Sequence, residues 1–411
     1  MRFRVVAFLL SFALWVYSHV MQSEKPTQRE SFSVFSFGLP VKDNTPTVET
    51  VSTSQNASSL QPNTEIRHED PFKVRLPLSI PTIAIEPATT FNDSDVWKWE
   101  GLIDYNRVTN NCVNRFRNAL PYYVIYHVDS TVGFANQFRS LVGVFLIALV
   151  SNRRLLINWD DYYNITNSAF TELRYERQNI KVPTKMYLRF DRNFCNSTRY
   201  ASYDVERIFG SRHLSFQTLS DLSCLVLPNP AYRAILKELG FVVDRGDHLI
   251  RGQIARILLT PNAELTYFIR QNLKAFDTEH VIGVQVRTGG WLASTFEYGS
   301  FLRRTAVMNI GSYVLAEMEK RHWNQTNCKV FLTSDSNTAV RMITASLNGK
   351  ASIIIPSGYK AGHSSAYMDY KNHYKHLYRA IMDLVLLSQT HPVFWTEGSS
   401  YGLLAARLSL G

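Results

Sequence analysis

The sequence has few of the residues and patterns that mark several common classes of protein. Its 411 residues include only four cysteines, and their spacing does not match that of a zinc site. No internal repeat and no His-Glu-x-x-His motif is present, so a zinc protease is unsupported. The net charge of +10 comes without a lysine-rich run, which argues against nucleic acid as a partner. A basic surface or a phosphate-bearing substrate explains this charge better.

The first 21 residues predict entry into the secretory pathway. Arg2 and Arg4 precede an apolar run that continues to about Tyr17, and no small-residue cleavage site follows it. Positive charge before the run favours an uncleaved anchor with its N-terminus in the cytosol. We therefore predict a cytosolic tail over 1–4 and a transmembrane signal anchor over 5–21. A cleaved signal peptide is the alternative.

Residues 22–95 are rich in serine, threonine and proline and show no sustained periodicity. This composition predicts a disordered stem that holds a folded head away from the membrane. Five Asn-x-Ser/Thr sequons support a lumenal head and predict glycosylation at Asn56, Asn92, Asn164, Asn196 and Asn324. In an oxidising lumen the four cysteines suit one or two disulfides, and the three possible pairings stay open.

From residue 96 onward, apolar runs with strand and helix periods alternate. Strands are predicted over 122–127, 154–159, 281–287, 329–334, 351–356 and 392–396. Helices are predicted over 138–151, 261–276 (with Thr260 as N-cap), 301–323, 338–347, 372–388 and 401–410. Residues 162–256 contain only short mixed segments. The alternation predicts an α/β fold of doubly wound parallel sheets. We expect two Rossmann-like domains, over 96–275 and 276–411, that face each other across a cleft.

Ligands of such sheets bind beyond the carboxyl ends of the strands, so the loops that follow the strands are the candidate sites. The loop over 130–139 places polar side chains before a helix N-terminus, where N–H groups attract anions. A simple capped turn fits these residues equally well. A second loop has Arg287, Thr288 and Gly289 directly after a buried strand. A guanidinium there can bind a diphosphate through two hydrogen bonds, and a salt bridge between loops is the alternative.

Two later loops also have polar residues at strand ends. Asp335 and Ser336 follow the strand over 329–334. An aspartate in this place can accept hydrogen bonds from a ribose or a guanine, or it can cap the next helix. The last loop has Ser399, Ser400 and Tyr401 at a strand-to-helix turn, where N–H groups and hydroxyls suit a phosphate.

No Asp-x-Asp doublet follows a strand, as a metal-bound nucleotide would require. Asp160 and Asp161 come nearest to that pattern. We therefore predict no metal site.

At these loops the sequence resembles the fucosyltransferase superfamily with a GT-B-type fold, and most closely the xyloglucan-type α1,2-fucosyltransferase family. The resemblance extends from about residue 121 to the end of the chain. Residues 132–137 resemble the family's first Gly-x-Gly-Asn loop, with Ala135 in place of the second glycine. Residues 283–287 resemble its donor-binding strand, with Gln285 in place of the histidine of the broader superfamily. Residues 333–336 and 397–402 resemble two later donor-side motifs.

The resemblance implies an inverting transfer of fucose from GDP-fucose to a glycan hydroxyl, without a metal or another cofactor; an α1,2 linkage to galactose is one form of it. Arg287 would be the catalytic residue, because it would neutralise the leaving diphosphate. The donor-binding residues would be Gln285, Arg287, Thr288, Gly289, Asp335, Ser336, Ser399, Ser400 and Tyr401. The acceptor side would include Asn136, Gln137, Arg139, Asp160 and Asp161.

The expected partners are thus a nucleotide-sugar donor, a glycan or glycoconjugate acceptor, and the membrane that holds the anchor. A single-pass type II protein of the Golgi membrane with a lumenal head fits these expectations. Two alternatives stay open. One is a non-catalytic glycan- or nucleotide-binding protein on a decayed transferase fold. The other is a transferase that uses another nucleotide sugar and a metal.

Overall fold

The computed structural model describes residues 32–34, 103–167, 169–170, 173–175, 186–188, 204–209, 213–290, 293, 301–359 and 373–410. The predicted anchor over 5–21 and three sequon asparagines, Asn56, Asn92 and Asn196, lie outside these residues. No helix within the described residues is long and apolar enough to cross a membrane.

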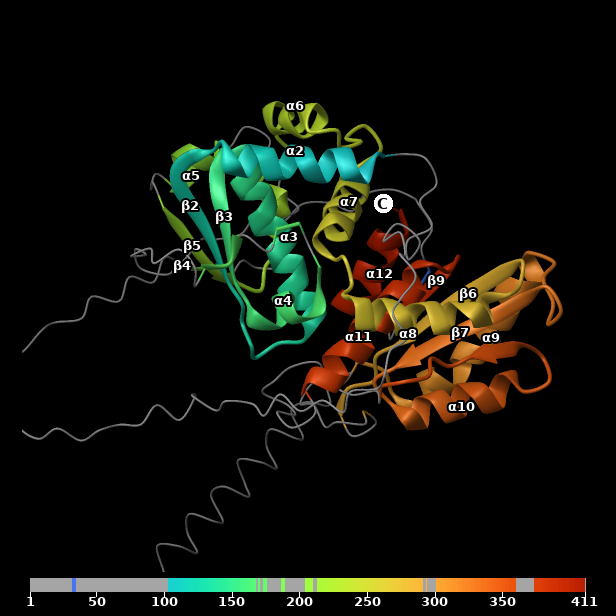
Figure 1. Cartoon of the computed structure of the whole chain (residues 1–411). Helices are drawn as coiled ribbons and strands as arrows, with labels where there is room; N and C mark the ends of the chain where they lie inside the picture. Colours follow the sequence, from blue (N-terminus) through green and yellow to red (C-terminus); the bar gives the residue numbers. More distant parts are fainter. Residues whose placement is uncertain are drawn as a thin grey trace, which may run out of the picture. The chain divides into compact units, whose positions relative to one another are not determined.

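The described residues fall into two compact units (Figure 1). An N-terminal unit comprises residues 103–129 and 136–271, and a C-terminal unit comprises 32–34, 130–135 and 272–409. Each unit has its own sheet. The predicted α/β fold with parallel sheets is confirmed, because strands of each sheet are parallel and alternate along the chain with helices.

The sheet of the N-terminal unit has four parallel strands in the order β3-β2-β5-β4. These strands are β2 (Leu120–His127), β3 (Arg153–Asn158), β4 (Met186–Leu188) and β5 (Leu214–Thr218). The helices, including the short 3-10 helix η6, are α2 (Tyr105–Arg117), α3 (Phe134–Val150), α4 (Asp160–Ile165), α5 (Val205–Phe209), η6 (Leu222–Leu225), α6 (Pro230–Glu238), α7 (Asp247–Leu258) and α8 (Ala263–Leu273). The rings of Phe116 on α2 and Phe145 on the apolar helix α3 pack edge to face, with centroids 5.3 Å apart. This contact joins α2 to the core.

The sheet of the C-terminal unit has the order β1-β9-β6-β7-β8, with only β1 antiparallel. Its strands are β1 (Phe32–Val34), β6 (His280–Val286), β7 (Cys328–Ser334), β8 (Ser352–Ile354) and β9 (Val393–Thr396). Its helices are η7 (Lys274–Phe276), α9 (Arg304–Lys320), α10 (Asn337–Leu347), α11 (His373–Ser388) and α12 (Ser400–Leu410), the last of which is assigned to this unit as far as Ser409.

Helices cover both faces of this C-terminal sheet. Val284 of β6 and Leu332 of β7 belong to one core cluster with Val307 of α9 and Ile343 of α10. Side chains alternate between the faces of a strand, so Gln285 and Thr333 point to the opposite face. That face is covered by α11 and α12: a side chain added at Gly283 would meet Leu387, and one at Gly402 would meet Trp395. The doubly wound arrangement predicted from the strand and helix periods is therefore present in this unit.

One local prediction was wrong. The cap of α8 is Asn262, whose Oδ1 accepts the N–H of Leu265 at 2.9 Å, because asparagine is a better cap than the predicted Thr260. The carbonyl of Thr260 instead accepts the N–H of Asn167. Within the predicted stem, residues 32–34 form β1, which pairs with the outer side of β9 and covers a sheet edge that would otherwise be open.

Candidate functional site

The carboxyl edge of the C-terminal sheet holds a loop that Asp335 organises. The N–H and the hydroxyl of Thr288 donate to Asp335 Oδ1 at 2.9 and 3.0 Å, and the N–H of Gly289 donates to Oδ2 at 2.9 Å. Gly289 and Gly290 both have a positive φ, which glycine adopts at little cost. Both oxygens of Asp335 are thus in use and its side chain is only 6% exposed, so in this structure it positions the loop.

Arg287 leaves β6 at the same edge. Its N–H donates to Thr396 Oγ1 at 2.8 Å, at the end of the neighbouring strand β9. Its Nε lies 3.6 Å from Asp335 Oδ2, and its guanidinium stands 5.6 Å from the ring centroid of Phe301. The N–H of Phe301 donates to the carbonyl of Thr288 at 2.8 Å, so this ring is fixed to the same loop. The Arg287 side chain is 22% exposed, so part of it reaches the surface at this edge.

Gln285 lies on β6, two residues before Arg287, and its buried amide oxygen can still accept a hydrogen bond. The residue is 4% exposed, and its Oε1 has no hydrogen-bond partner within the described part of the chain. A side chain added at Gly402 would come within 2.8 Å of that oxygen and within 2.3 Å of Trp395. The missing side chain at Gly402 therefore allows α12 to start directly against Gln285.

The residues at the start of α12 differ in what they can offer. Ser399 caps the helix, because its carbonyl accepts the N–H of Leu403 at 3.2 Å and its hydroxyl accepts that of Gly402 at 3.4 Å. Ser400 is half-buried and makes no side-chain hydrogen bond among the described residues. Tyr401 is turned inward, and its hydroxyl donates to the carbonyl of Ala380 on α11. Burial and the nearby Asp383 raise the pKa of Tyr401 well above its ordinary value, so it remains a donor.

Residues 398–402 also match the Gly-x-Ser-x-Gly pattern of serine hydrolases, with Ser400 in the place of the nucleophile. That nucleophile sits on a strained turn, and a histidine bonds it. Ser400 has no positive φ and bonds no histidine among the described residues. The geometry of a hydrolase elbow is thus missing here.

Ser336 is a structural cap. It is fully buried, and its hydroxyl accepts the N–H of Ala339 at 3.1 Å at the start of α10. Of the nine predicted donor-side residues, the structure therefore leaves Gln285, Arg287 and Ser400 with side chains able to meet a ligand. The others shape the edge around them.

A buried ionic network lies on the same face of the sheet, and the sequence patterns did not point to it. Asp383 of α11 accepts the hydroxyl of Thr333 at 2.5 Å and pairs with Arg379 Nε at 2.7 Å. Burial raises the pKa of Asp383 above its ordinary value, although Arg379 and Thr333 oppose the shift. A charged residue within the apolar run of 380–387, four residues after an arginine, was the available signal.

In the N-terminal unit, two of the predicted acceptor-side residues are bonded to their own unit. Gln137 Nε2 donates to the carbonyl of Asp129 at 3.0 Å, and the carbonyl of Gln137 accepts the hydroxyl of Tyr126 at 2.7 Å. Arg139 Nη2 donates to the carbonyl of Leu219 at 3.1 Å, which ties α3 to the segment after β5. Both side chains hold the strand ends together.

The other predicted acceptor-side residues lie at element starts. Asn136 is half-buried in the first turn of α3. Asp160 and Asp161 begin α4, and Asp160 forms a salt bridge of 2.6 Å with Arg174. Ala135 lies in the helical first turn of α3 and has no positive φ, so the glycine that it replaces is not needed there.

Sequence patterns also missed a histidine at the carboxyl end of β2. His127 is 5% exposed, with Asn158 Nδ2 2.9 Å from its Nδ1 and Ser215 Oγ 2.9 Å from its Nε2. With the amide of Asn158 donating to Nδ1, Nε2 carries the proton and donates to Ser215. His127 therefore joins strands β3, β2 and β5 at this edge.

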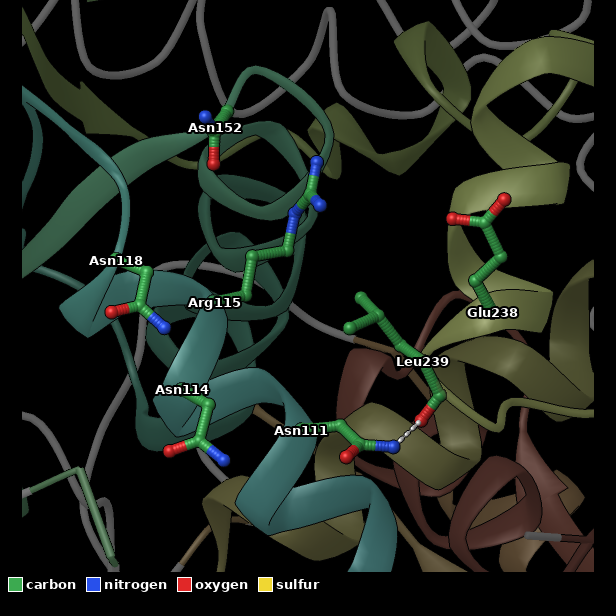
Figure 2. Close-up of a pocket in the computed structure, with 7 residues that line it drawn as sticks. All are labelled: Asn111, Asn114, Arg115, Asn118, Asn152, Glu238 and Leu239. Carbon is green, nitrogen blue, oxygen red and sulfur yellow. Dashed lines mark hydrogen bonds between the residues drawn. The ribbon is translucent and has the colours of Figure 1, made fainter.

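A cavity of about 360 Å³ lies elsewhere in the N-terminal unit (Figure 2). Its lining is mostly polar and comes from α2, the turn before β3 and the end of α6: Asn111, Asn114, Arg115, Asn118, Asn152, Glu238 and Leu239. Asn152 immediately precedes β3, so the cavity lies at the amino edge of the sheet, away from the strand ends where ligands of such sheets bind. It contains none of the predicted site residues.

Within the described ranges, no group of three or more His, Cys, Asp or Glu side chains is placed to hold a metal ion.

The comparisons with known proteins give matches among solved structures. No protein-family model matches the chain, and no curated protein matches it. A mutant of Arabidopsis thaliana FUT1 in complex with GDP is 16% identical, with a TM-score of 0.49, and the match covers 73% of this chain and 72% of that one. The fucosyltransferase NodZ from Bradyrhizobium is 12% identical, with a TM-score of 0.42 over 70% and 93% of the two chains. A NodZ alpha-1,6-fucosyltransferase soaked with GDP-fucose is 13% identical, with a TM-score of 0.41 over 70% and 93%.

Proposed function

We propose that the chain is an inverting, metal-independent glycosyltransferase that moves fucose from GDP-fucose to a glycan hydroxyl. The observation that carries the proposal is a partly exposed guanidinium, that of Arg287, held at the carboxyl edge of a parallel sheet by Asp335 and Phe301. Beside it lies the buried Oε1 of Gln285, which has no hydrogen-bond partner among the described residues and packs against the start of α12. A fixed cation and a helix N-terminus at such an edge suit a diphosphate. The choice of fucose and of guanine rests on the sequence resemblance of residues 283–287, 333–336 and 397–402.

In the proposed reaction, an acceptor hydroxyl oxygen attacks the anomeric carbon of fucose from the face opposite the diphosphate. The new carbon–oxygen bond forms as the bond to the β-phosphate oxygen breaks, and GDP leaves with the electron pair. Arg287 stabilises the charge that grows on the leaving diphosphate. The hydroxyl proton passes to a general base as the new bond forms.

We also propose that the protein is a single-pass type II protein of the Golgi membrane, with the anchor over 5–21 and the head in the lumen. The basic residues before the apolar run and the exposed sequon residues Asn164 and Asn324 support this topology.

The function is tested with the full chain, purified in detergent from eukaryotic cells. GDP binding is measured by calorimetry, and GDP release from GDP-fucose is measured with a pool of glycan acceptors, with and without EDTA. We expect binding, release that depends on acceptor, and no effect of EDTA. Binding without release from any acceptor would identify a non-catalytic binding protein. Loss of release in EDTA would identify a metal-dependent transferase.

The donor site is tested with Arg287→Ala. Because a hydrogen bond to a charged group contributes about 1.5–3 kcal/mol, GDP binding should weaken roughly 10- to 100-fold. Arg341→Ala is the matched control, since Arg341 lies on α10, which covers the opposite face of the sheet. Unchanged GDP binding by Arg287→Ala would show that the donor site lies elsewhere.

A further inference from the structure

A second guanidinium lies on the same face of the C-terminal sheet as Arg287. Arg379 of α11 has two of its nitrogens fixed: Nε pairs with Asp383 Oδ1 at 2.7 Å, and Nη1 donates to the carbonyl of Tyr359 at 2.6 Å. Asp383 in turn accepts the hydroxyl of Thr333 of β7 at 2.5 Å. Both side chains of the ion pair are nearly buried, with 11% of Arg379 and 5% of Asp383 exposed. The guanidinium is therefore held in one orientation before any ligand binds.

The sheet register places Arg379 near the proposed donor site. Thr333 is the direct partner of Gln285 across β7 and β6, and Arg287 follows Gln285 by two residues on the same face. The chain passes from β8 through α11 to the parallel strand β9, so α11 runs against the strands and begins at their carboxyl edge. Arg379 precedes Asp383 by one turn of that helix and is thus nearer to this edge.

The start of α12 lies next to the same residue. The hydroxyl of Tyr401 donates to the carbonyl of Ala380, the residue after Arg379. Gly402 packs against Gln285, so the first turn of α12 contacts both elements. Arg379, Gln285 and the N-terminus of α12 consequently surround one corner of the edge.

Arg379 keeps unused bonding capacity. No hydrogen bond within the part of the chain that the structure describes involves its Nη2, which carries two N–H groups. Gln285 Oε1, on the neighbouring strand, also lacks a hydrogen-bond partner within the described ranges. A buried ion pair contributes little net stability compared with apolar residues of the same volume, so stability alone gives a weak reason for this pair.

We propose that Arg379 is a second donor-binding residue, whose Nη2 donates to a diphosphate oxygen of the nucleotide together with Arg287. The inference rests on the proposed function, because it assumes that the edge binds a nucleoside diphosphate. Asp383, Thr333 and Tyr359 are its positioning residues. Two guanidiniums fixed in advance would spread the negative charge of the leaving diphosphate over two cations.

Two variants separate binding from folding, and the double one removes both charges of the pair together, because Arg379→Ala alone would leave Asp383 buried and unpaired. Asp383→Asn keeps the guanidinium, and the double variant Arg379→Gln/Asp383→Asn removes it. We expect GDP binding by the full chain to weaken by about threefold in Asp383→Asn, because an amide oxygen still accepts from Arg379 Nε but holds the guanidinium less firmly than a carboxylate. It should be roughly 10- to 100-fold weaker in the double variant, with guanosine binding unchanged in both. Circular dichroism checks that both variants fold.

Equal GDP binding by the single and double variants would overturn the proposal and leave Arg379 a structural residue. An equal loss of guanosine binding would also overturn it, since the contact would then not be to the diphosphate. If the double variant does not fold, Arg379→Lys keeps a charge beside Asp383 but removes Nη2. It should weaken GDP binding, and unchanged binding would overturn the proposal. Wild type that binds no GDP would instead refute the proposed function itself.

Discussion

Asp335 binds three donors of one loop, and this fixes where the backbone of Thr288 and Gly289 lies. A carboxylate that is filled by its own chain has little capacity left for a guanine or a ribose. Asp335 also lies 3.6 Å from Nε of Arg287, so it can act on a ligand indirectly through that guanidinium.

This arrangement predicts the behaviour of Asp335→Ala. The variant leaves two N–H groups and one hydroxyl without acceptors, so the free energy of unfolding should fall by about 1–3 kcal/mol. Affinities for GDP, ADP and UDP should fall by a similar factor, because the loop and Arg287 serve the diphosphate of each. Denaturant titration and calorimetry measure the two effects. Asp335→Asn keeps one acceptor oxygen, so its free energy of unfolding and its nucleotide affinities should lie between those of Asp335→Ala and wild type. A loss confined to GDP would show that Asp335 reads the base directly.

Sequence patterns could predict which residues lie at the sheet edge, but not which side chains bond to one another there. Arg287 and Ser400 follow strands whose apolar runs are plain, so their place at the sheet edge could be predicted. The bonds of Asp335 to Thr288, and of Asp383 to Thr333, join residues 47 and 50 positions apart. Such pairs depend on strand register, which one sequence does not specify.

At the scale of elements, the position of α12 depends on its close approach to the sheet. Gly402 lies against Trp395 of β9, and its packing brings the first turn of the helix to Gln285 of β6. A helix that starts so close to strand ends directs its free N–H groups toward that edge.

Gly402→Ala should therefore destabilise the protein. The new Cβ would lie 2.3 Å from Trp395 Cβ, a backbone-fixed atom, so the helix or the strand must shift. Overpacking of this kind costs about 1–3 kcal/mol of the free energy of unfolding, and GDP binding should weaken as α12 moves. Ser400→Ala is the control for stability, with an expected change within about 0.5 kcal/mol, since its hydroxyl makes no hydrogen bond in the described structure. Equal stability of Gly402→Ala and wild type would show that the contact is not tight.

Element prediction succeeded where apolar runs were long and failed where they were short. The strands β6, β7 and β9 and the helices α10, α11 and α12 begin and end within one or two residues of their predicted limits. The segment over 162–256 contains β5, α6 and most of α7, yet its apolar runs are too short to distinguish the strand period from the helix period.

At the scale of the whole molecule, disulfide bonding divides the described cysteines, all of which are buried, into two classes. Cys112 and Cys328 are free and fully buried, one in each unit, and Cys224 is disulfide-bonded. Cys195 lies outside the described residues. Burial raises the pKa of Cys112 well above its ordinary value and raises that of Cys328 to about 11. Since the thiolate is the reactive form, both thiols should be inert in the folded protein.

Thiol labelling tests this division in the intact chain. Iodoacetamide at pH 8 should label neither Cys112 nor Cys328 in the native protein, because both are inaccessible and protonated. In denaturant without reductant both should be labelled, whereas Cys224 should react only after reduction. Peptide mass spectrometry identifies the labelled sites. Labelling of Cys328 in the native state would mean that the core of the C-terminal unit opens readily, and labelling of Cys224 without reductant would exclude its disulfide. The pattern predicted here requires an oxidising compartment during folding, so a protein made in the cytosol should show Cys224 reactive as well.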